Sequence, residues 1–352
     1  MQLVAIGAQD VFLTGNPQIT FFKVVYKRHT NFSKETIQQK WSGSGIRKTC
    51  TLSRNGDLVQ EIYMQGTEQT YGGLKSVEVE IGGQKIDKHY GTWLAIYDEL
   101  FETNRPLSAA IVGDFLPLQF WFNRNPGLAL PLIALQYHEV KIVAEWHTVS
   151  ITSYIGNTAI TTTTSAADNA AKCSGLLVNY VYLDTDERRR FAQVSHEYLI
   201  EQVQHTGVET IGTADGAKSI TLTYNHPVKA LFWSGMLKTA YNAKLQLNGH
   251  DRFSEQPALY FTGVQPYECG LRHPKAGAVS AATTNAGMYS FCLKPGEHQP
   301  SGSCNFSRID NARLVLSGIT ATTGAAETLN VFALNYNVLR VMSGMGGLTY
   351  SN

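Results

Sequence analysis

Short runs in which apolar and polar residues alternate dominate this chain. Successive side chains of a β-strand point to opposite faces, so Val77, Val79 and Ile81 share one face of a predicted strand. Many further runs of β-branched and aromatic residues end at Gly, Asn or Pro, and few windows show a helical period. The clearest runs are 76–81, 219–224 and 244–247. The pattern predicts an all-β protein, in which each strand's apolar face is covered by a second sheet.

The strand ends repeat at a nearly constant offset of about half the chain. Residues 81–83 resemble 247–249 at an offset of 166, 140–142 resemble 312–314 at 172, and 57–59 resemble 226–228 at 169. Unrelated strands would not often keep such similar offsets. With 352 residues, the chain is long enough for two domains at roughly 100 to 200 residues each. The repeat therefore predicts two copies of one sandwich.

Two segments have the pattern of short helices. Residues 93–101 would bury Trp93 and Phe101 and leave Asp98 and Glu99 on a solvated face. Residues 184–193 begin with N-cap candidates, which predicts a helical joint between the two sandwiches. Stretches rich in Ala, Thr, Ser and Gly predict exposed loops at 158–171, 276–287 and 318–327.

The charge balance argues against a nucleic-acid or membrane partner. There are 29 Lys and Arg residues against 28 Asp and Glu, and the formal net charge is +1. The longest basic run, 188–190, is flanked by acidic residues, so it predicts a locally neutralised turn or helix. No apolar run approaches the roughly 20 residues that span a bilayer, and polar residues interrupt the N-terminus too often for a secretory signal. We expect a soluble protein with no direct contact to nucleic acid.

No catalytic or metal-binding pattern stands out, so we expect no enzyme activity and no cofactor. The ten histidines include no His-x-His pair, and the nine-residue spacing after His138 and after His196 places the rings on opposite strand faces. The serine nucleophile motif Gly-x-Ser-x-Gly is absent. The glycine-rich run 343–347 lies too near the end of the sequence to precede a phosphate-binding helix, which favours a flexible turn. Five scattered cysteines without a Cys-x-x-Cys pair indicate free thiols in a reducing compartment.

The N-terminal segment 7–33 combines aromatic residues, turn residues and few charges, and it closely resembles the N-terminal arm of a known family. That family comprises the major capsid proteins of nucleocytoplasmic large DNA viruses, particularly those of algal viruses. Further resemblances follow in order along the chain, at 53–58, 80–90, 126–140, 300–311 and 335–347. The resemblance therefore extends over the whole chain.

The resemblance implies a double jelly roll, made of two consecutive eight-stranded antiparallel jelly rolls with short helices in loops. It places an arm at 1–28, the first roll at 29–184, a linker at 185–196, the second roll at 197–340 and a tail at 341–352. We expect the apolar arm to pack beneath a barrel or against a neighbouring capsomer, because side chains such as Phe12 and Phe21 are poorly suited to water.

The implied function is that of a structural major capsid protein, assembled in the host cytoplasm and found in the virion. It would form homotrimers that tile an icosahedral shell as pseudo-hexagonal capsomers. Expected partners are neighbouring capsomers and minor capsid and penton proteins, with the internal viral membrane reached only indirectly. A minor capsid paralogue and a carbohydrate-binding jelly-roll protein are the alternatives.

Three asparagines are candidate sites for attached sugars. Asn31 and Asn305 each begin an Asn-x-Ser acceptor sequence. The resemblance adds Asn157, beside a threonine run, because some members of this family carry sugars at unusual asparagines on outer loops.

Overall fold

The computed structural model consists of two units, Met1–Phe32 and Ser33–Asn352. The residues that it describes are 6–24, 26–66, 71, 73–101, 115–147, 152–155, 158–161, 173–212, 215–235, 241–271, 286–319 and 327–351. No helix in these ranges is long and apolar enough to cross a membrane.

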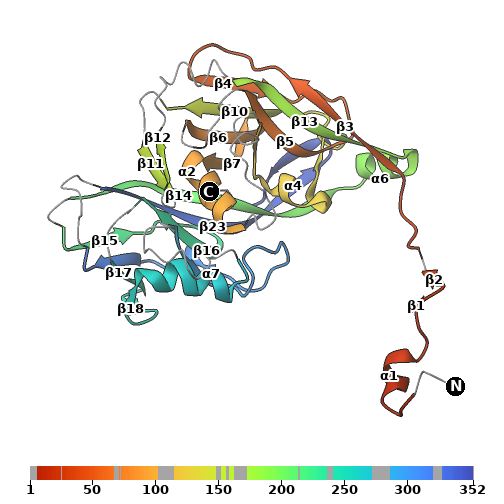
Figure 1. Ribbon diagram of the computed structural model, residues 1–352. Helices are drawn as coiled ribbons and strands as arrows, with labels where there is room; N and C mark the ends of the chain where they lie inside the picture. The colour runs from red at the N-terminus through yellow and green to blue at the C-terminus, as the bar shows by residue number, and fades with distance from the viewer. Residues whose placement is uncertain are drawn as a thin grey trace. The chain divides into compact units, whose positions relative to one another are not determined.

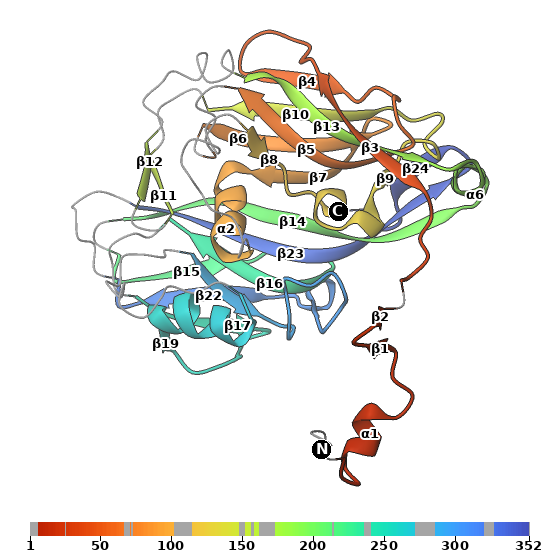
Figure 2. The same cartoon turned by 45° about the vertical axis from the view of Figure 1, so that its right-hand side comes forward.

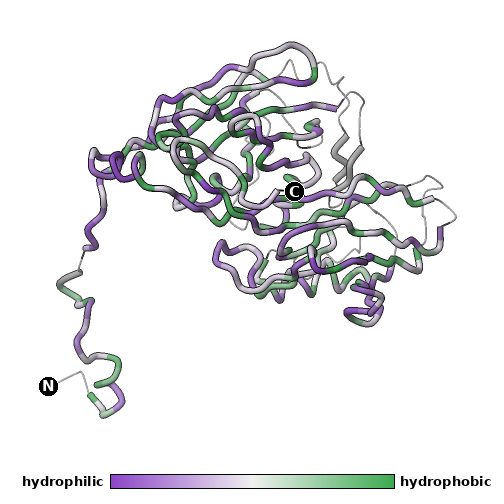
Figure 3. The backbone as a smooth tube through the Cα atoms, turned by 180° about the vertical axis from the view of Figure 1, so that it is seen from behind, coloured by the Kyte–Doolittle hydropathy of each residue, from purple (hydrophilic) through white to green (hydrophobic). Residues whose placement is uncertain are grey.

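The N-terminal unit contains little regular structure. It has a one-turn helix α1 (Asp10–Thr14) and a two-stranded ribbon of β1 (Ile19–Thr20) and β2 (Lys23–Val24). The apolar stretch of α1 is visible in Figure 3, and Phe12 is 92% exposed. Phe21 and Phe22 are 95% and 93% exposed. Within the described part of the arm these side chains are exposed, and the packing that we expected for them stays a prediction.

The first half of the larger unit is a sandwich of two antiparallel sheets (Figure 1). One sheet has the order β3-β13-β5-β8, with bounds Phe32–Gln39, Cys173–Leu183, Leu58–Gly66 and Phe115–Pro117. The other has the order β4-β10-β6-β7, with bounds Arg47–Thr51, Val140–Trp146, Leu74–Ile81 and Gln84–Tyr90. Short strand β9 (Leu130–Pro131) adds to β5.

The second half repeats this arrangement strand for strand. One sheet has the order β14-β23-β16-β20, with bounds His196–Ile211, Glu327–Met342, Pro227–Ser234 and Gly287–Ser290. The other has the order β15-β22-β17-β18, with bounds Ala217–Thr221, Ala312–Ser317, Asn242–Leu247 and His250–Asp251. Short strands β19 (Gln256–Pro257) and β21 (Cys304–Asn305) add to β17 and β16. In each half, eight strands therefore form one jelly roll, and the predicted fold class is confirmed.

The repeat extends to individual turns. The β6–β7 and β17–β18 hairpins each close through two residues with positive φ, Gly82-Gly83 (58° and 81°) and Asn248-Gly249 (51° and 80°). Two such residues define the type I′ turn, which Gly and Asn adopt with little strain. Equivalent hydrogen bonds follow, from Gly82 N to Glu139 O at 2.9 Å and from Asn248 N to Asn311 O at 2.7 Å. The offsets seen in the sequence thus mark equivalent positions.

Helices connect and flank the strands. Helix α2 (Gly91–Phe101) matches the helix predicted at 93–101, and α6 (Thr185–Gln193) matches the predicted joint. The Asp184 side chain caps α6 by accepting a hydrogen bond from Thr185 N. In the second roll, a π-helical turn η2 (Tyr260–Val264) runs into α7 (Gln265–Glu268). The remaining short turns are α4 (Trp121–Arg124), η1 (Pro126–Leu128) and η3 (Phe306–Arg308).

Three loop predictions were wrong at their edges. Residues 158–161 form strand β12 (Thr158–Thr161), which pairs with β11 (Thr152–Ile155). Gly287 begins β20 and is buried so closely against Trp233 that a side chain there would collide with the indole ring. Ile319 is also buried, and Glu327 already belongs to β23. Ala286 is also buried, and Gly318 is also among the described residues. The rest of these stretches, 162–171, 276–285 and 320–326, lies outside the described residues.

Two further predictions need correction. Asp98 is only 8% exposed, since α2 is enclosed on more sides than its pattern indicated. The expected flexible turn at 343–347 is a hairpin, in which β24 (Met345–Leu348) pairs with β23. Ser343 and Gly344 have φ of 54° and 80°, so a third turn with two positive φ values reverses the chain here.

Candidate assembly surfaces

The two jelly rolls meet through helix α2 of the first roll. Figure 2 shows α2 beside β14, β16 and β23, the sheet of the second roll that turns its outer face toward the first. The ring centroid of Trp93 lies 5.3 Å from that of Phe232 and 5.7 Å from that of Phe332. Phe101 lies 5.7 Å from Phe232. Trp93, Phe232 and Phe332 belong to one hydrophobic core cluster, against which Phe101 packs, so the rings of α2 and of the sheet share one apolar core.

A buried charge cluster lies in the same junction. Lys229 of β16 is fully buried, and its Nζ lies 2.5 Å from Glu201 Oε1 and donates to Glu297 O at 3.0 Å. Arg124 of α4 donates from Nη1 to Glu201 Oε2 at 2.6 Å, across the junction. Burial is the largest single cause and opposes the charge on Arg124, but Glu201 together with Tyr97 and Asp87 outweighs it and raises the pKa of the guanidinium above its ordinary value. One carboxylate therefore pairs with two cations.

Aromatic rings support both cations. The Arg124 guanidinium lies 5.4 Å from the ring centre of Tyr97, and the Lys229 ammonium lies 5.1 Å from that of Tyr336. Such contacts stabilise a desolvated cation. Burial raises the pKa of the Tyr336 hydroxyl, so the phenol stays neutral beside Glu201.

Hydrogen bonds tie the edge strands of the two rolls together. Val203 N of β14 donates to Asp87 Oδ1 of β7 at 3.1 Å, and Gln202 Nε2 donates to Ile86 O. His89 Nε2 lies 2.9 Å from the other oxygen of Asp87, and both side chains are buried. These hydrogen bonds join the two rolls of a single chain.

The equivalent outer face of the first roll has a different composition. Inward residues Val59, Ile62 and Met64 of β5 correspond to Val228, Leu231 and Trp233 of β16. The outward residues between and beside them are Glu61 and Tyr63 in the first roll and Ala230 and Phe232 in the second. On the neighbouring strands, Leu177 pairs with Tyr63, and Phe332 pairs with Phe232. Four outward positions can thus be compared. In the second roll they hold the apolar residues Ala230, Phe232, Phe332 and Leu334. In the first roll they hold Glu61, Tyr63, Leu177 and Asn179, most of which are polar.

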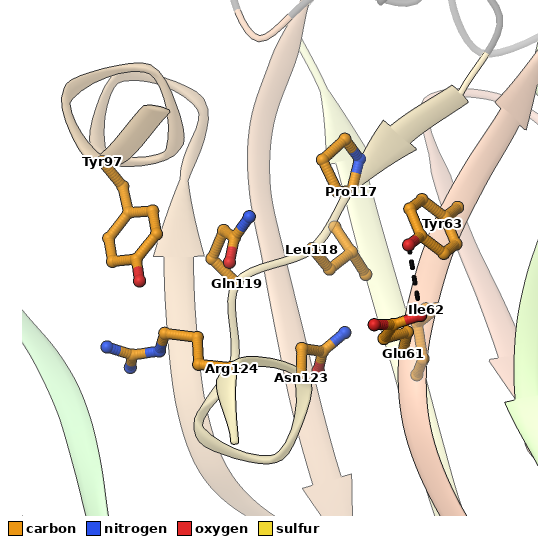
Figure 4. A pocket seen from close by; sticks show the side chains of 9 residues that line it. All are labelled: Glu61, Ile62, Tyr63, Tyr97, Pro117, Leu118, Gln119, Asn123 and Arg124. Carbon is orange, nitrogen blue, oxygen red and sulfur yellow. Dashed lines mark hydrogen bonds between the residues drawn. The ribbon is translucent and has the colours of Figure 1, made fainter. Parts of the chain in front are cut away.

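A row of hydrogen bonds crosses this polar face. Thr36 Oγ1 donates to Asn179 Oδ1 at 2.5 Å, Asn179 Nδ2 donates to Glu61 Oε2 at 2.7 Å, and Tyr63 Oη donates to the same oxygen at 3.3 Å. A pocket of about 290 Å³ opens beside these residues (Figure 4). Its opposite wall is formed by Gln119, Asn123 and Arg124, with Tyr97 at the far side. The face is ordered by its own polar contacts and remains half-exposed.

The structure places the candidate glycosylation residues apart from this face. Asn31 is exposed in the arm. Asn305 is exposed at the end of β21, and its Oδ1 caps η3 by accepting from Ser307 N at 3.1 Å. Asn157 lies outside the described residues. Sugar attachment stays a prediction for all three.

The histidines that we considered as metal ligands have other neighbours. His138 Nδ1 lies 3.1 Å from Gly346 O, and His196 Nε2 lies 2.9 Å from Phe191 O. Within the described ranges, no group of three or more His, Cys, Asp or Glu side chains could hold a metal ion. The five cysteines are present as free thiols.

Sequence reasoning missed the buried charge cluster. A signal was present, because Lys229 interrupts an otherwise apolar strand, Val-Lys-Ala-Leu-Phe-Trp at 228–233. A lysine in such a strand is rarely buried unless it is paired. The sequence did not indicate that its partners would be Glu201 and Arg124.

Comparison with known proteins agrees with this architecture. The family model for the major capsid protein N-terminus matches residues 20–184, and the model for the large eukaryotic DNA virus major capsid protein matches 187–242 and 236–347. The major capsid protein of Pyramimonas orientalis virus is 51% identical, with the match covering 100% of this chain and 99% of that protein. The quasi-atomic model of the PBCV-1 virus capsid has a TM-score of 0.77 at 37% identity, covering 95% of this chain and 100% of the other. The Faustovirus major capsid protein shares the fold, with a TM-score of 0.70 at 11% identity over 96% and 94% of the two chains.

Fold and surfaces together define a structural protein of the double jelly-roll class, which functions through its contacts with other proteins. The chain belongs to the family of major capsid proteins of large eukaryotic DNA viruses. The resemblance noted in the sequence is thereby confirmed, and the place of such a protein is the capsid of the virion.

Proposed function

We propose that this protein forms homotrimeric capsomers that tile the icosahedral shell of a large DNA virus. The observation that carries this proposal is the strand-for-strand repeat, because each chain supplies two nearly equivalent blocks side by side. Three chains then supply six blocks, which pack with near-sixfold symmetry. Closed point-group symmetry is the usual outcome for homo-oligomers.

The division of labour along the chain follows the same proposal. The arm is placed at 1–28, the rolls at 29–184 and 197–340, the linker at 185–196 and the tail at 341–352. The arm's exposed aromatic side chains support a role in contacts between capsomers. Minor capsid and penton proteins are the further partners, assembly takes place in the host cytoplasm, and the protein has no catalytic activity or direct contact with nucleic acid.

Light scattering on the purified protein tests the trimer. We expect a particle of three times 38.8 kDa at micromolar concentration. A monomer under those conditions would contradict the proposal. Band quantification in purified virions separates a major shell component from a minor capsid paralogue, since only the former dominates the protein content.

A further inference from the structure

The contact between the two rolls is made by two surfaces, one from each roll, which we call its two halves. Because the rolls are repeats, the chain contains a second copy of each half. One half is the helix that follows the β7 edge of the first roll, and the other is the outer face of the β14-β23-β16-β20 sheet. In the observed contact, α2 lies on this face through Trp93 and Phe101. The second roll has its own helix in the corresponding place, η2–α7, and the first roll has its own β3-β13-β5-β8 face.

Among the described residues, these second halves are less covered than the halves of the observed contact. Eight of the eleven residues of α2 are buried, whereas η2–α7 and the residue before it expose apolar side chains. Leu259 is 57% exposed, Val264 is 42% exposed and Tyr267 is 69% exposed. On the first roll, Tyr63 and Leu177 are half-exposed at the positions where the second roll has the covered residues Phe232 and Phe332.

We propose that η2–α7 of one copy packs on the β5–β13 outer face of the next copy, over the pocket beside Glu61 and Tyr63. This contact would repeat between chains the arrangement that α2 and the second roll form within a chain. The occupant of the face is therefore a second copy of this protein. The inference rests on the proposed trimer, and it identifies the surfaces that hold the trimer together.

The geometry of the internal contact supports this choice of partner. The contact is head-to-tail, because the helix side of one roll meets the sheet side of the next. A head-to-tail interface closes into a ring when the rotation between units permits it, and three chains then alternate internal and external versions of one contact.

The chemistry of the two faces also fits. An internal junction forms during folding and never separates, so it can be as apolar as a core. A face that waits in water for a second copy must stay soluble, and interfaces between separately folded proteins keep aromatic residues among polar ones. Tyr63 and the Thr36–Asn179–Glu61 hydrogen bonds meet that requirement.

A photo-cross-linker tests the contact directly. Tyr267 is replaced by benzoylphenylalanine, the purified trimer is irradiated, and products are separated on a denaturing gel and mapped by mass spectrometry. We expect a product of two-chain mass, with the probe attached to peptides within 58–66 or 173–183. The same probe at Tyr137, which is 76% exposed, serves as the control and should not label those peptides.

The outcomes separate this inference from the trimer itself. If the trimer forms and the probe at position 267 labels its own chain, another segment or nothing, the inference is wrong and the trimer stands. If the unmodified protein is monomeric, both fail.

Three substitutions supply an independent measurement. Tyr267→Asp should weaken trimer association at least tenfold by light scattering across a dilution series, and Tyr267→Phe should preserve it. Tyr137→Asp, at a tyrosine of similar exposure, should leave association unchanged. Equal effects of the two Asp variants would overturn the assignment, and circular dichroism confirms that each variant is folded.

Discussion

The two jelly rolls share their strand order, yet their equivalent outer faces differ in chemistry. The face of the second roll carries Ala230, Phe232, Phe332 and Leu334, and helix α2 covers it. The corresponding face of the first roll carries Glu61, Tyr63, Leu177 and Asn179, joined by hydrogen bonds and half-open to solvent. The fold therefore does not determine the chemistry of the face. We infer that the difference follows from the partner surface, which belongs to the same chain for the second roll and to a second copy for the first.

The largest effect is expected from removing the arm. This deletion tests whether the polar face of the first roll is sufficient for shell formation without the arm. A protein that lacks residues 1–26 should keep both rolls folded, since the strands and core clusters of the rolls lie within the larger unit. It should nevertheless fail to form shells, which electron microscopy of an assembly reaction would show. Normal shells from the shortened protein would refute the role that we give to the arm.

Truncating the equivalent aromatic residues tests the comparison itself. Phe232→Ala should lower the free energy of unfolding by about 3–5 kcal/mol, as expected for a large buried aromatic ring. Tyr63→Ala removes a half-exposed ring and should cost about 1 kcal/mol or less in the isolated chain. Chemical denaturation at a dilution where light scattering shows dissociated chains measures both values. Similar losses would mean that the two faces are equally covered before assembly.

Replacing an acidic residue should also cost more stability at the covered face of the second roll than at the polar face of the first. Glu201→Gln leaves Lys229 and Arg124 buried without their carboxylate, which we expect to cost about 3–5 kcal/mol. Glu61→Gln keeps hydrogen-bonding capacity in a half-exposed row and should cost about 0.5–1 kcal/mol. Urea titrations of the two variants against the unchanged protein provide the measurement. A mild effect of Glu201→Gln would show that water reaches the junction.

The smallest effect concerns thiol chemistry. Burial raises the pKa of Cys50 to about 11, whereas Cys304 of the second roll is half-buried. An unfolded thiol titrates near pH 8.5, so the folded state holds the proton more tightly and stability should fall slightly as pH rises from about 9 to 11. At pH 8, alkylation followed by mass spectrometry should label Cys304 well before Cys50. Rapid labelling of Cys50 in the folded protein would contradict this burial.

Much of the fold could be predicted because local rules determine it. Alternation gave the strands, and the glycine and asparagine residues of the turns fixed the offset between the two rolls. Asp184 marked the start of α6. In contrast, β12 formed from a threonine run that reads as a loop, since its pairing with β11 depends on chain geometry.

The assembly surfaces were harder to predict because they depend on which distant segments meet. Nothing local to Asp98 indicates that α2 is enclosed by the second roll. Lys229 was visible as an anomaly, but its bond to Glu201 joins strands β16 and β14, which pair with opposite edges of β23. Tyr63 and Phe232 can be recognised as equivalent residues only when the strand register is known.

The position of α2 also has a consequence for the order of events on the ribosome. The helix ends at Phe101, and the sheet that covers it begins with β14, but its ring contact Phe232 on β16 emerges only about 130 residues after Phe101. At typical synthesis rates of about 5–20 residues per second, Trp93 and Phe101 remain uncovered for roughly 7 to 26 seconds. During that interval the nascent chain presents an aromatic helix to other nascent chains on the same message. High-level expression of this protein therefore favours slow translation through the first roll or the presence of a chaperone that holds α2 until the second roll arrives.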